Sequence, residues 1–181
     1  MDELTRLARA AGRGDDAALA MFVRQTHPDV WRFCAHLVDP AVADDLTQDT
    51  YVRACRSLRT LRDESGIRTW LLILARRTCA AEIDRRVRQR EIALRVRSTA
   101  PVEYAPDHGG ESDVRVLISQ LAPERRHAFV LTQLVGCDYA EAAEICGVPL
   151  GTIRSRVARA REDLIAALAG DVREPRSMRH N

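Results

Sequence analysis

The stretch from Tyr139 to Glu162 constrains the fold of this chain more than any other part of the sequence. A helix-turn-helix needs a small residue where its two helices cross, a left-handed turn residue four positions later, and a β-branched core residue six positions beyond that. Ala143, Gly147 and Ile153 stand at this spacing, and Asp138 begins a capping-box pattern at the start of the first helix. The stretch therefore predicts a helix-turn-helix, with an ordinary two-helix hairpin as the alternative.

The helix that follows the turn is predicted to have one apolar and one basic face. When its residues are placed at about 100° per residue, the apolar ones fall within an arc of about 60° and form a buried seam: Ile153, Val157, Ala160 and Leu164. Arg154, Ser155 and Arg159 face away from this seam, with Arg156 and Arg161 beside them. Arginine binds guanine edges and phosphates through paired hydrogen bonds, so this face favours duplex DNA over the alternative of a solvated arginine surface.

Residues 98–112 divide the chain into two parts. They contain two prolines and two glycines and show no helical periodicity, which is typical of a flexible linker. Fully extended, such a linker reaches about 50 Å. The sequence therefore predicts two small domains, a helical N-terminal domain in residues 1–97 and the helix-turn-helix domain in residues 113–170. A disordered tail is expected in residues 171–181.

Both flanks of the linker are predicted to be helical, and no strand-like alternation is long enough to compete with this prediction. An apolar stripe in residues 17–33 predicts a helix that is interrupted near His27 and Pro28. Further helices are expected where helical periodicity follows a proline, a cap or a turn: residues 40–61, 67–96, 114–121, 124–135 and 150–168. Gly136 is expected in the left-handed conformation after one of them. The expected fold class is all-α.

Composition excludes several classes of enzyme. All 28 basic residues are arginine, so a Walker-type phosphate loop, a pyridoxal Schiff base and a lysine general base are ruled out. A metal enzyme or hydrolase using Cys34, His36 and His27 is one alternative, but residues two apart on a helix point in nearly opposite directions. The five cysteines are scattered without a CxxC pair, which is typical of reduced thiols. We therefore expect no enzyme activity, no cofactor and no metal.

Neither a membrane span nor an export signal is expected. Uninterrupted apolar runs such as Trp70 to Ala75 are at most seven residues long, whereas about 20 are needed to cross a bilayer. The first residues are acidic at the start and lack the apolar core of a secretory signal. The expected localisation is the cytoplasm, without direct membrane insertion.

A family resemblance emerges at the helix-turn-helix. The segment Gly147-Val-Pro-Leu-Gly-Thr-Ile-Arg-Ser-Arg-Val-Ala-Arg-Ala-Arg161 resembles the pattern G-x-x-x-G-T-[VI]-[KR]-S-R-x-x-R-A-R. That pattern belongs to the C-terminal domain of extracytoplasmic-function (group 4) sigma factors of bacterial RNA polymerase. In that family the second helix lies in the major groove of the promoter −35 element. The resemblance implies DNA contacts from Arg154, Ser155 and Arg159, with Arg156 mainly a phosphate-binding or structural residue.

The N-terminal half carries a second resemblance. Val42 to Ala54 is similar to the family's A-E-D-[LV]-x-Q-[ED]-x-[FY]-x-[RK]-[AV], the region that docks on the clamp helices of the largest polymerase subunit. Helical spacing places four residues on one face of this segment, three of them acidic or polar and one apolar: Asp45, Gln48, Asp49 and Val52. The opposite face is expected to be buried: Leu46, Thr50, Ala54 and Leu58. Without the family, the acidic face could equally be an ordinary solvated surface. The resemblance implies that the polymerase-binding residues are Asp44, Asp45, Gln48 and Asp49.

A third segment, Ile67 to Thr78, resembles the family's [FY]-[RK]-x-W-L-x-x-I-[AV]-R-N-x, its −10 recognition helix. Arg77 stands where the family frequently has asparagine, and Trp70 is expected in the helix core. The arginine-rich continuation of this helix is suited to following a phosphate backbone. The resemblance implies that the −10 contacts come from Arg68, Arg76, Arg77, Arg85, Arg86 and Arg88.

Together these segments predict a sigma factor of the extracytoplasmic-function type, which binds core RNA polymerase and directs initiation at promoters with −10 and −35 elements. Its implied partners are core polymerase and promoter DNA, and the family leaves room for an anti-sigma protein. One alternative is a stand-alone helix-turn-helix transcription regulator with an α-helical partner-binding lobe. Another is an adaptor that sequesters a partner, in which case the basic helix would be idle.

Overall fold

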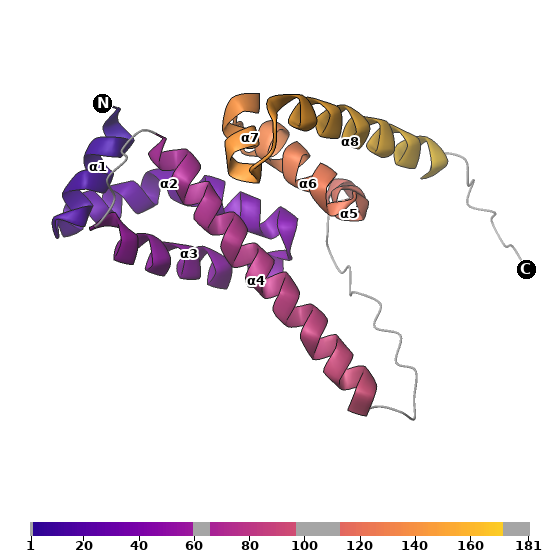
Figure 1. Ribbon diagram of the computed structural model, residues 1–181, viewed down its shortest axis with the longest axis horizontal. Helices are drawn as coiled ribbons and strands as arrows, with labels where there is room; N and C mark the ends of the chain where they lie inside the picture. The colour runs from indigo at the N-terminus through magenta and orange to yellow at the C-terminus, as the bar shows by residue number, and fades with distance from the viewer. Residues whose placement is uncertain (1, 60–65, 97–112, 172–181) are drawn as a thin grey trace, which may run out of the picture.

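The structure, a computed structural model, describes residues 2–59, 66–96 and 113–171, and all regular structure within them is helical (Figure 1). The predicted linker, residues 98–112, and all but the first residue of the predicted tail, residues 171–181, lie outside this part of the chain. The helices, in chain order, are α1 (Glu3–Gly12), α2 (Asp16–Leu37), the 3-10 turn η1 (Pro40–Val42), α3 (Ala43–Leu58), α4 (Ile67–Val96), α5 (Asp113–Gln120), α6 (Pro123–Phe129), the π-helical turn η2 (Val130–Leu134), α7 (Tyr139–Cys146) and α8 (Leu150–Asp171). The all-α fold class is confirmed.

The first helix, α1, was not predicted from the sequence, although its local signal is clear. The Asp2 carboxylate caps it by accepting a hydrogen bond from the Thr5 amide at 2.6 Å. Ala8 is buried against the rest of the domain, and Gly12 lies where α1 meets the end of α3. A β-carbon at Gly12 would come within 2.7 Å of the Leu58 carbonyl oxygen. A glycine is therefore required for this close approach of the two helices.

The predicted interruption near His27 and Pro28 is wrong, because α2 continues through both residues. A proline inside a helix removes one backbone hydrogen bond, here the one to the Arg24 carbonyl. Arg24 and Pro28 lie on the exposed side of α2, where water can bind that carbonyl. On the inner side, Phe22 and Val30 are fully buried on either side of the proline. The free energy gained by burying the inner side of α2 is thus larger than the cost of the backbone hydrogen bond that Pro28 removes.

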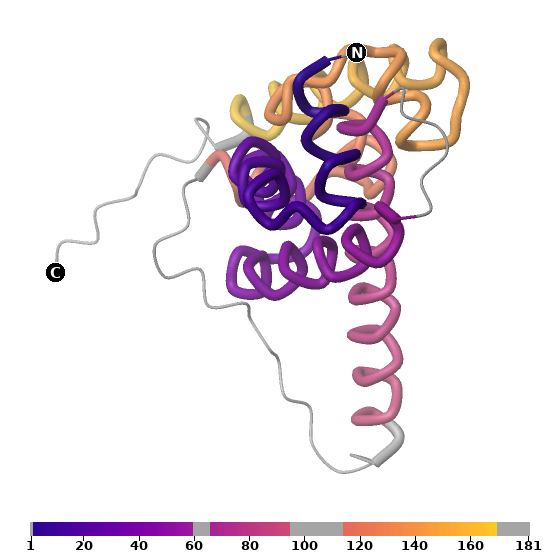
Figure 2. Tube along the Cα trace, turned by 90° about the vertical axis from the view of Figure 1, so that its left-hand side faces the viewer, coloured from indigo at the N-terminus to yellow at the C-terminus, as the bar shows by residue number. Residues whose placement is uncertain are grey.

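The bounds of the next two helices, α3 and α4, match those expected from the sequence except at the C-terminal end of α3. The helix expected over residues 40–61 begins as a 3-10 turn, whose Ala41 amide bonds the Asp39 carboxylate, and ends at Leu58. The helix expected over residues 67–96 has those bounds, as α4. Figure 2 shows the C-terminal half of α4 projecting beyond the other helices of the domain. Its side chains in that half are therefore mostly exposed, including Ile83 and Val87.

The helix-turn-helix is confirmed as α7, a glycine turn and α8. Asp138 caps α7 through a complete capping box with Glu141. Gly147 has a φ of 67° and Gly136 a φ of 78°, so both adopt the predicted left-handed conformation. The helix expected over residues 124–135 differs in its second half, because η2 widens into a π-helical turn in which the Val135 amide bonds the Val130 carbonyl at 2.9 Å.

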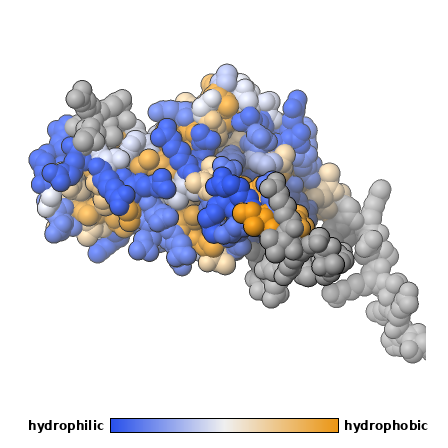
Figure 3. All heavy atoms as spheres, turned by 60° about the horizontal axis from the view of Figure 1, so that its bottom comes forward, coloured by the Kyte–Doolittle hydropathy of each residue, from blue (hydrophilic) through white to orange (hydrophobic). Residues whose placement is uncertain are grey.

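The two domains pack against each other rather than standing apart. Helix α7 lies on α4, and η2 and α5 lie on α2 (Figure 1). Fully buried side chains from both domains belong to one continuous hydrophobic core: Phe22, Phe33, Leu71 and Leu72 from the first, and Leu131, Ile145 and Ile153 from the second. The sequence predicted the two domains but not this arrangement. On the face that Figure 3 shows, hydrophilic residues predominate, with smaller apolar patches between them.

Candidate DNA- and polymerase-binding surfaces

Helix α8 presents the basic face that its sequence predicted. Its seam is buried: Ile153, Val157 and Ala160 fully, and Leu164 in part. Arg154, Ser155 and Arg159 are exposed on the other side. These three side chains are therefore placed to reach a DNA groove in the structure as it stands.

The two arginines beside this face, Arg156 and Arg161, are engaged within the protein. Arg156 is half-buried and lines a pocket of about 230 Å³ together with Arg76 of α4. Arg161 donates a hydrogen bond to the Gln133 side chain at 2.8 Å. The Arg125 guanidinium of α6 also binds the Asp163 carboxylate, at 2.5 Å. These contacts fix the position of α8 on its own domain and leave the exposed trio for an outside partner.

Helix α3 separates acidic and apolar residues in the way its spacing predicted. Its inner side is buried: Leu46, Thr50, Ala54 and Leu58. Its outer side is exposed and carries the predicted polymerase-binding residues: Asp44, Asp45, Gln48 and Asp49. Nothing in the described part of the second domain covers this acidic face, because α3 packs on α1, α2, η1 and α4.

One residue of the acidic face is held by an aromatic side chain that the sequence analysis missed. The Trp31 indole N–H, on α2, donates a hydrogen bond to the Asp44 carboxylate at 2.9 Å. Trp31 is half-buried, and its polar edge therefore lies at the border of the acidic face. The pairing joins residues 13 positions apart on two helices, so no local pattern could have indicated it.

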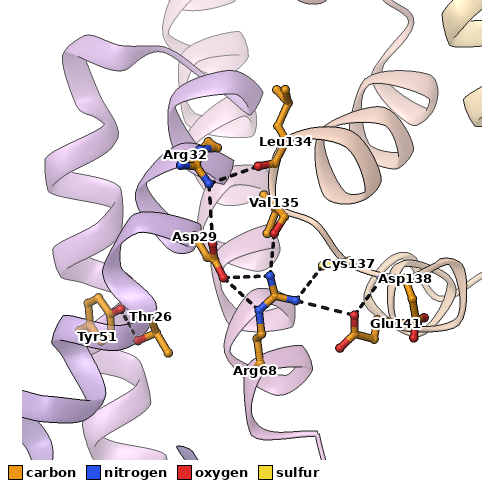
Figure 4. Close-up of polar contacts among 10 residues, drawn as sticks. All are labelled: Thr26, Asp29, Arg32, Tyr51, Arg68, Leu134, Val135, Cys137, Asp138 and Glu141. Atoms are coloured by element: carbon orange, nitrogen blue, oxygen red, sulfur yellow. Dashed lines mark hydrogen bonds and ion pairs between the residues drawn. The ribbon is translucent and has the colours of Figure 1, made fainter.

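Arg68, predicted as a −10 contact, binds the second domain (Figure 4). From the start of α4, its guanidinium donates to the Asp29 carboxylate at 2.9 Å and to the Val135 carbonyl at 2.7 Å. A further ion pair joins it to Glu141 at 3.7 Å. Arg68 and Asp29 are both about three-quarters buried, with 28% and 25% of their side chains exposed. This cluster joins α2, α4 and the start of the helix-turn-helix.

The electrostatics of this cluster favour the charged arginine. Burial alone would lower the pKa of Arg68. The Cys137 thiolate, which forms below the pH at which arginine titrates, and then the Asp29 and Glu141 carboxylates outweigh burial and raise that pKa. Burial raises the pKa of the Cys137 thiol to about 11, so this group meets Arg68 as a neutral thiol at 3.5 Å. Arg32 adds a second link between the domains through the Leu134 carbonyl, at 3.2 Å (Figure 4).

The other predicted −10 residues fall into two groups. Arg77, Arg85 and Arg88 are exposed along α4. Arg76 is half-buried, and its Nε atom has no hydrogen-bond partner within the part of the chain that the structure describes. Arg86 is also half-buried and binds Glu82 at 2.8 Å and Asp39 at 3.6 Å. The structure thus leaves some of this basic surface accessible and engages the rest within the protein.

Glu82 is the acidic centre of that internal network. Its carboxylate accepts hydrogen bonds from Arg85 at 2.7 Å and from Arg86 at 2.8 Å. These two guanidinium groups, Arg85 first, lower the pKa of Glu82 to about 2. Glu82 therefore stays ionised at any physiological pH and holds both arginines on the surface of α4.

The residues of the alternative metal site do not come together. Cys34 is fully buried, whereas His27 is exposed. Across residues 2–59, 66–96 and 113–171, no group of three or more histidine, cysteine or acidic side chains is arranged to hold a metal ion. Within those same ranges, no helix combines the length and the apolar character needed to cross a membrane.

Both domains of the chain resemble those of known proteins. The chain matches the family models for sigma-70 region 2 over residues 22–89 and for sigma-70 region 4 over residues 112–164. It is 44% identical over 176 residues to the ECF RNA polymerase sigma factor SigC of Mycobacterium tuberculosis, with 91% of each chain covered. It is also 33% identical over 133 residues to the ECF RNA polymerase sigma factor EcfG of Rhodopseudomonas palustris, with 71% of this chain and 72% of that one covered.

Two solved structures share the fold. CnrH, solved in complex with the cytosolic domain of CnrY, superposes with a TM-score of 0.73 at 24% identity, covering 94% of this chain and 99% of that one. The sigma factor RpoE of Bartonella quintana, solved with the anti-sigma factor NepR, superposes with a TM-score of 0.69 at 28% identity, covering 83% and 96%. With the matches to both sigma-70 regions and the identity to SigC, these findings show that the chain belongs to the extracytoplasmic-function family of RNA polymerase sigma factors.

Proposed function

We propose that this chain is a promoter-specificity subunit that acts in the cytoplasm, binds core RNA polymerase and has no catalytic residues of its own. The observation that carries the proposal is the presence of two exposed surfaces of opposite charge on separate domains. One is the acidic face of α3, and the other is the arginine face of α8. A protein partner with a basic surface fits the first and DNA fits the second.

The α3 surface is the proposed docking site for the clamp helices of the polymerase. Asp45, Gln48 and Asp49 are exposed on it, and no described residue of the second domain covers them. Trp31 fixes the Asp44 carboxylate at one end, which reduces the side-chain entropy lost on binding. The site is accessible while the domains are packed together, so docking does not require prior rearrangement.

The α8 surface is the proposed reader of the −35 element. Arg154, Ser155 and Arg159 are exposed on one side of a helix that its own domain holds rigidly through Arg125 and Arg161. Each phosphate that the helix neutralises contributes about −0.9 to the slope of log K against log salt concentration. Binding of both domains to one polymerase makes the second DNA contact effectively intramolecular, which raises its strength without new contacts.

The −10 surface on α4 is only partly accessible in the packed form. Arg77 and Arg88 can meet phosphates directly, and Arg85 is exposed but paired with Glu82, whereas Arg68 is bound to the second domain. In this proposal Arg68 reaches DNA only after α7 and η2 leave α4 and α2. Polymerase docking through α3 comes first and domain separation follows. An anti-sigma protein is a candidate third partner, because the related RpoE was solved with one.

The proposal is tested by run-off transcription on a pool of promoters, using core polymerase with and without this chain. We expect specific transcripts only when the chain is present. Asp45→Arg should abolish both these transcripts and the capture of core polymerase in a pull-down, because it reverses charge in the centre of the acidic face. Asp16→Arg, an equally exposed site at the start of α2, is the matched control and should behave as wild type.

Two outcomes would contradict the proposal. Transcript patterns that are identical with and without the chain would remove the specificity role. Tight binding to one duplex at physiological salt without any polymerase would instead favour the stand-alone regulator. If Asp45→Arg and Asp16→Arg weaken capture equally, the acidic face is not the docking site.

A further inference from the structure

Two cysteines that the proposed function does not use meet in the core of the first domain. Cys34 on α2 and Cys79 on α4 are both fully buried. Their sulfur atoms lie 3.6 Å apart, and the Cys79 thiol donates its hydrogen to Cys34. The two residues are 45 positions apart in the chain, so only the packing of α2 on α4 brings them together.

A third helix contributes to the same site. The Thr47 hydroxyl of α3 is buried and has no hydrogen-bond partner among the described residues. The hydrogen that Cys79 donates is the larger influence on the Cys34 sulfur, and the neighbouring Thr47 hydroxyl is the smaller one. Both groups lower the pKa of the Cys34 thiol, although burial opposes them. Hydrogen bonding and burial raise the pKa of Cys79. The pair therefore has an asymmetric chemistry, with Cys34 the sulfur that loses its proton first.

We propose that Cys34 and Cys79 are an oxidation site, at which a peroxide converts the two thiols into a disulfide. The Cys34 thiolate attacks one peroxide oxygen and the O–O bond breaks, which gives a sulfenic acid, and the leaving hydroxide takes up the proton that Cys34 released to form one water molecule. The Cys79 sulfur then attacks the sulfenic sulfur, the new S–S bond forms and a second water leaves. In sum, two thiols and one hydrogen peroxide give one disulfide and two waters. The sulfurs must approach from 3.6 Å to about 2.05 Å.

Burial sets the rate of this reaction. Peroxide reaches Cys34 only when the packing of α2 on α4 opens transiently, so oxidation is slower than at partly exposed Cys55 and Cys146. The same burial protects the disulfide from reductants once it has formed. The cross-link ties α2 to the helix that carries the basic −10 surface. Oxidised protein should therefore unfold at a higher temperature than reduced protein.

The experiment treats the folded full-length chain with hydrogen peroxide, blocks the remaining thiols under denaturing conditions and maps tryptic peptides by mass spectrometry. Cleavage after arginine places Cys34 in peptide 33–53, Cys79 in peptide 78–85 and Cys55 in peptide 54–56. We expect a cross-linked species of peptides 33–53 and 78–85 that lacks two hydrogens and disappears with dithiothreitol. Its appearance should accompany a rise in the thermal midpoint.

Two matched variants show whether the disulfide is specific to Cys34 and Cys79 or arises from oxidation of cysteines in general. Cys79→Ser should abolish both the cross-link and the rise in midpoint, whereas Cys55→Ser should leave both unchanged. Because a core variant can fail to fold, the peptide map of the wild-type protein decides by itself. Irreversible oxidation of Cys34 without the cross-link would overturn the proposal. So would cross-links that join Cys55 or Cys146 instead, or a Cys34–Cys79 pair that stays reduced when peroxide treatment continues long after Cys55 is fully oxidised.

Discussion

Replacing Asp29 with alanine should loosen the two domains and expose the −10 surface. Asp29 lies on α2 and accepts a hydrogen bond from Arg68 at 2.9 Å, and Arg68 in turn binds the Val135 carbonyl of the second domain. The substitution Asp29→Ala removes the carboxylate that orients this guanidinium. It leaves Arg68 itself in the chain, so that any DNA contact of Arg68 is retained.

The magnitude follows from the geometry of the bond. A hydrogen bond to a charged group contributes about 1.5–3 kcal/mol, and a group that is about three-quarters buried keeps most of that value. Part of this free energy is kept in the variant, because Arg68 still forms its ion pair with Glu141 at 3.7 Å. The Asp29–Arg68 bond lies within the first domain and persists when the domains separate, so only the part that orients Arg68 toward Val135 is lost from the packed form. We take about 1 kcal/mol for that part, which corresponds to a shift of about 5-fold in the ratio of packed to separated domains.

Small-angle X-ray scattering measures the separation, and binding of a single-stranded −10 oligonucleotide measures its consequence. Asp29→Ala should increase the radius of gyration and strengthen oligonucleotide binding. Arg68→Met should also increase the radius of gyration but should not strengthen binding, because it removes the DNA contact as well. Arg24→Met, an exposed arginine on the same helix, is the control and should change neither. An unchanged radius of gyration in Asp29→Ala would refute the argument that this cluster holds the domains together.

Further predictions concern α8, the approach of α1 to α3, and the acidic centre of α4. Arg159→Ala should weaken binding to a −35 duplex by about 1–3 kcal/mol in a fluorescence anisotropy titration, because a bidentate contact to a base is lost. Gly12→Ala should lower the free energy of unfolding by about 1–3 kcal/mol in a denaturant titration, since its new β-carbon meets a backbone carbonyl at 2.7 Å. The stability that Glu82 adds through Arg85 and Arg86 is fully present above its ordinary pKa of 4.5, and it should be lost as the pH falls toward 2. Glu82→Gln should remove this part of the acid sensitivity of the free energy of unfolding.

Each of these predictions has an outcome that contradicts it. Equal loss of affinity for random duplex would make Arg159 a phosphate contact rather than a reader of bases. Gly151→Ala is the control for Gly12, because nothing lies within 4 Å of its new β-carbon. Gly151 lies in the first turn of α8, so its variant should change the free energy of unfolding only a little. A loss equal to that of Gly12→Ala would show that the contact with the Leu58 carbonyl is not the cause of the loss at Gly12. An acid transition that Glu82→Gln does not change would show that the network on α4 adds no stability.

Several features of the fold could be predicted from the sequence because their causes are local. The bounds of α4, the capping box at Asp138 and the left-handed conformation of Gly147 depend on residues within one helical turn. The buried seam of α8 and the inner side of α3 follow from helical periodicity alone. The family resemblance was also carried by continuous segments, so it too could be found without the fold.

The tertiary structure alone decided the features that join distant segments. Pro28 stays helical because Phe22 and Val30 are buried on either side of it, and local propensity could only predict a break. Arg68 was predicted to bind DNA, but its partners Asp29 and Val135 are 39 and 67 positions away. The contact of Cys34 with Cys79 has the same origin. Periodicity and capping act over a few residues, whereas the pairing of side chains is decided by how whole helices pack, and that packing minimises exposed apolar surface over the entire chain.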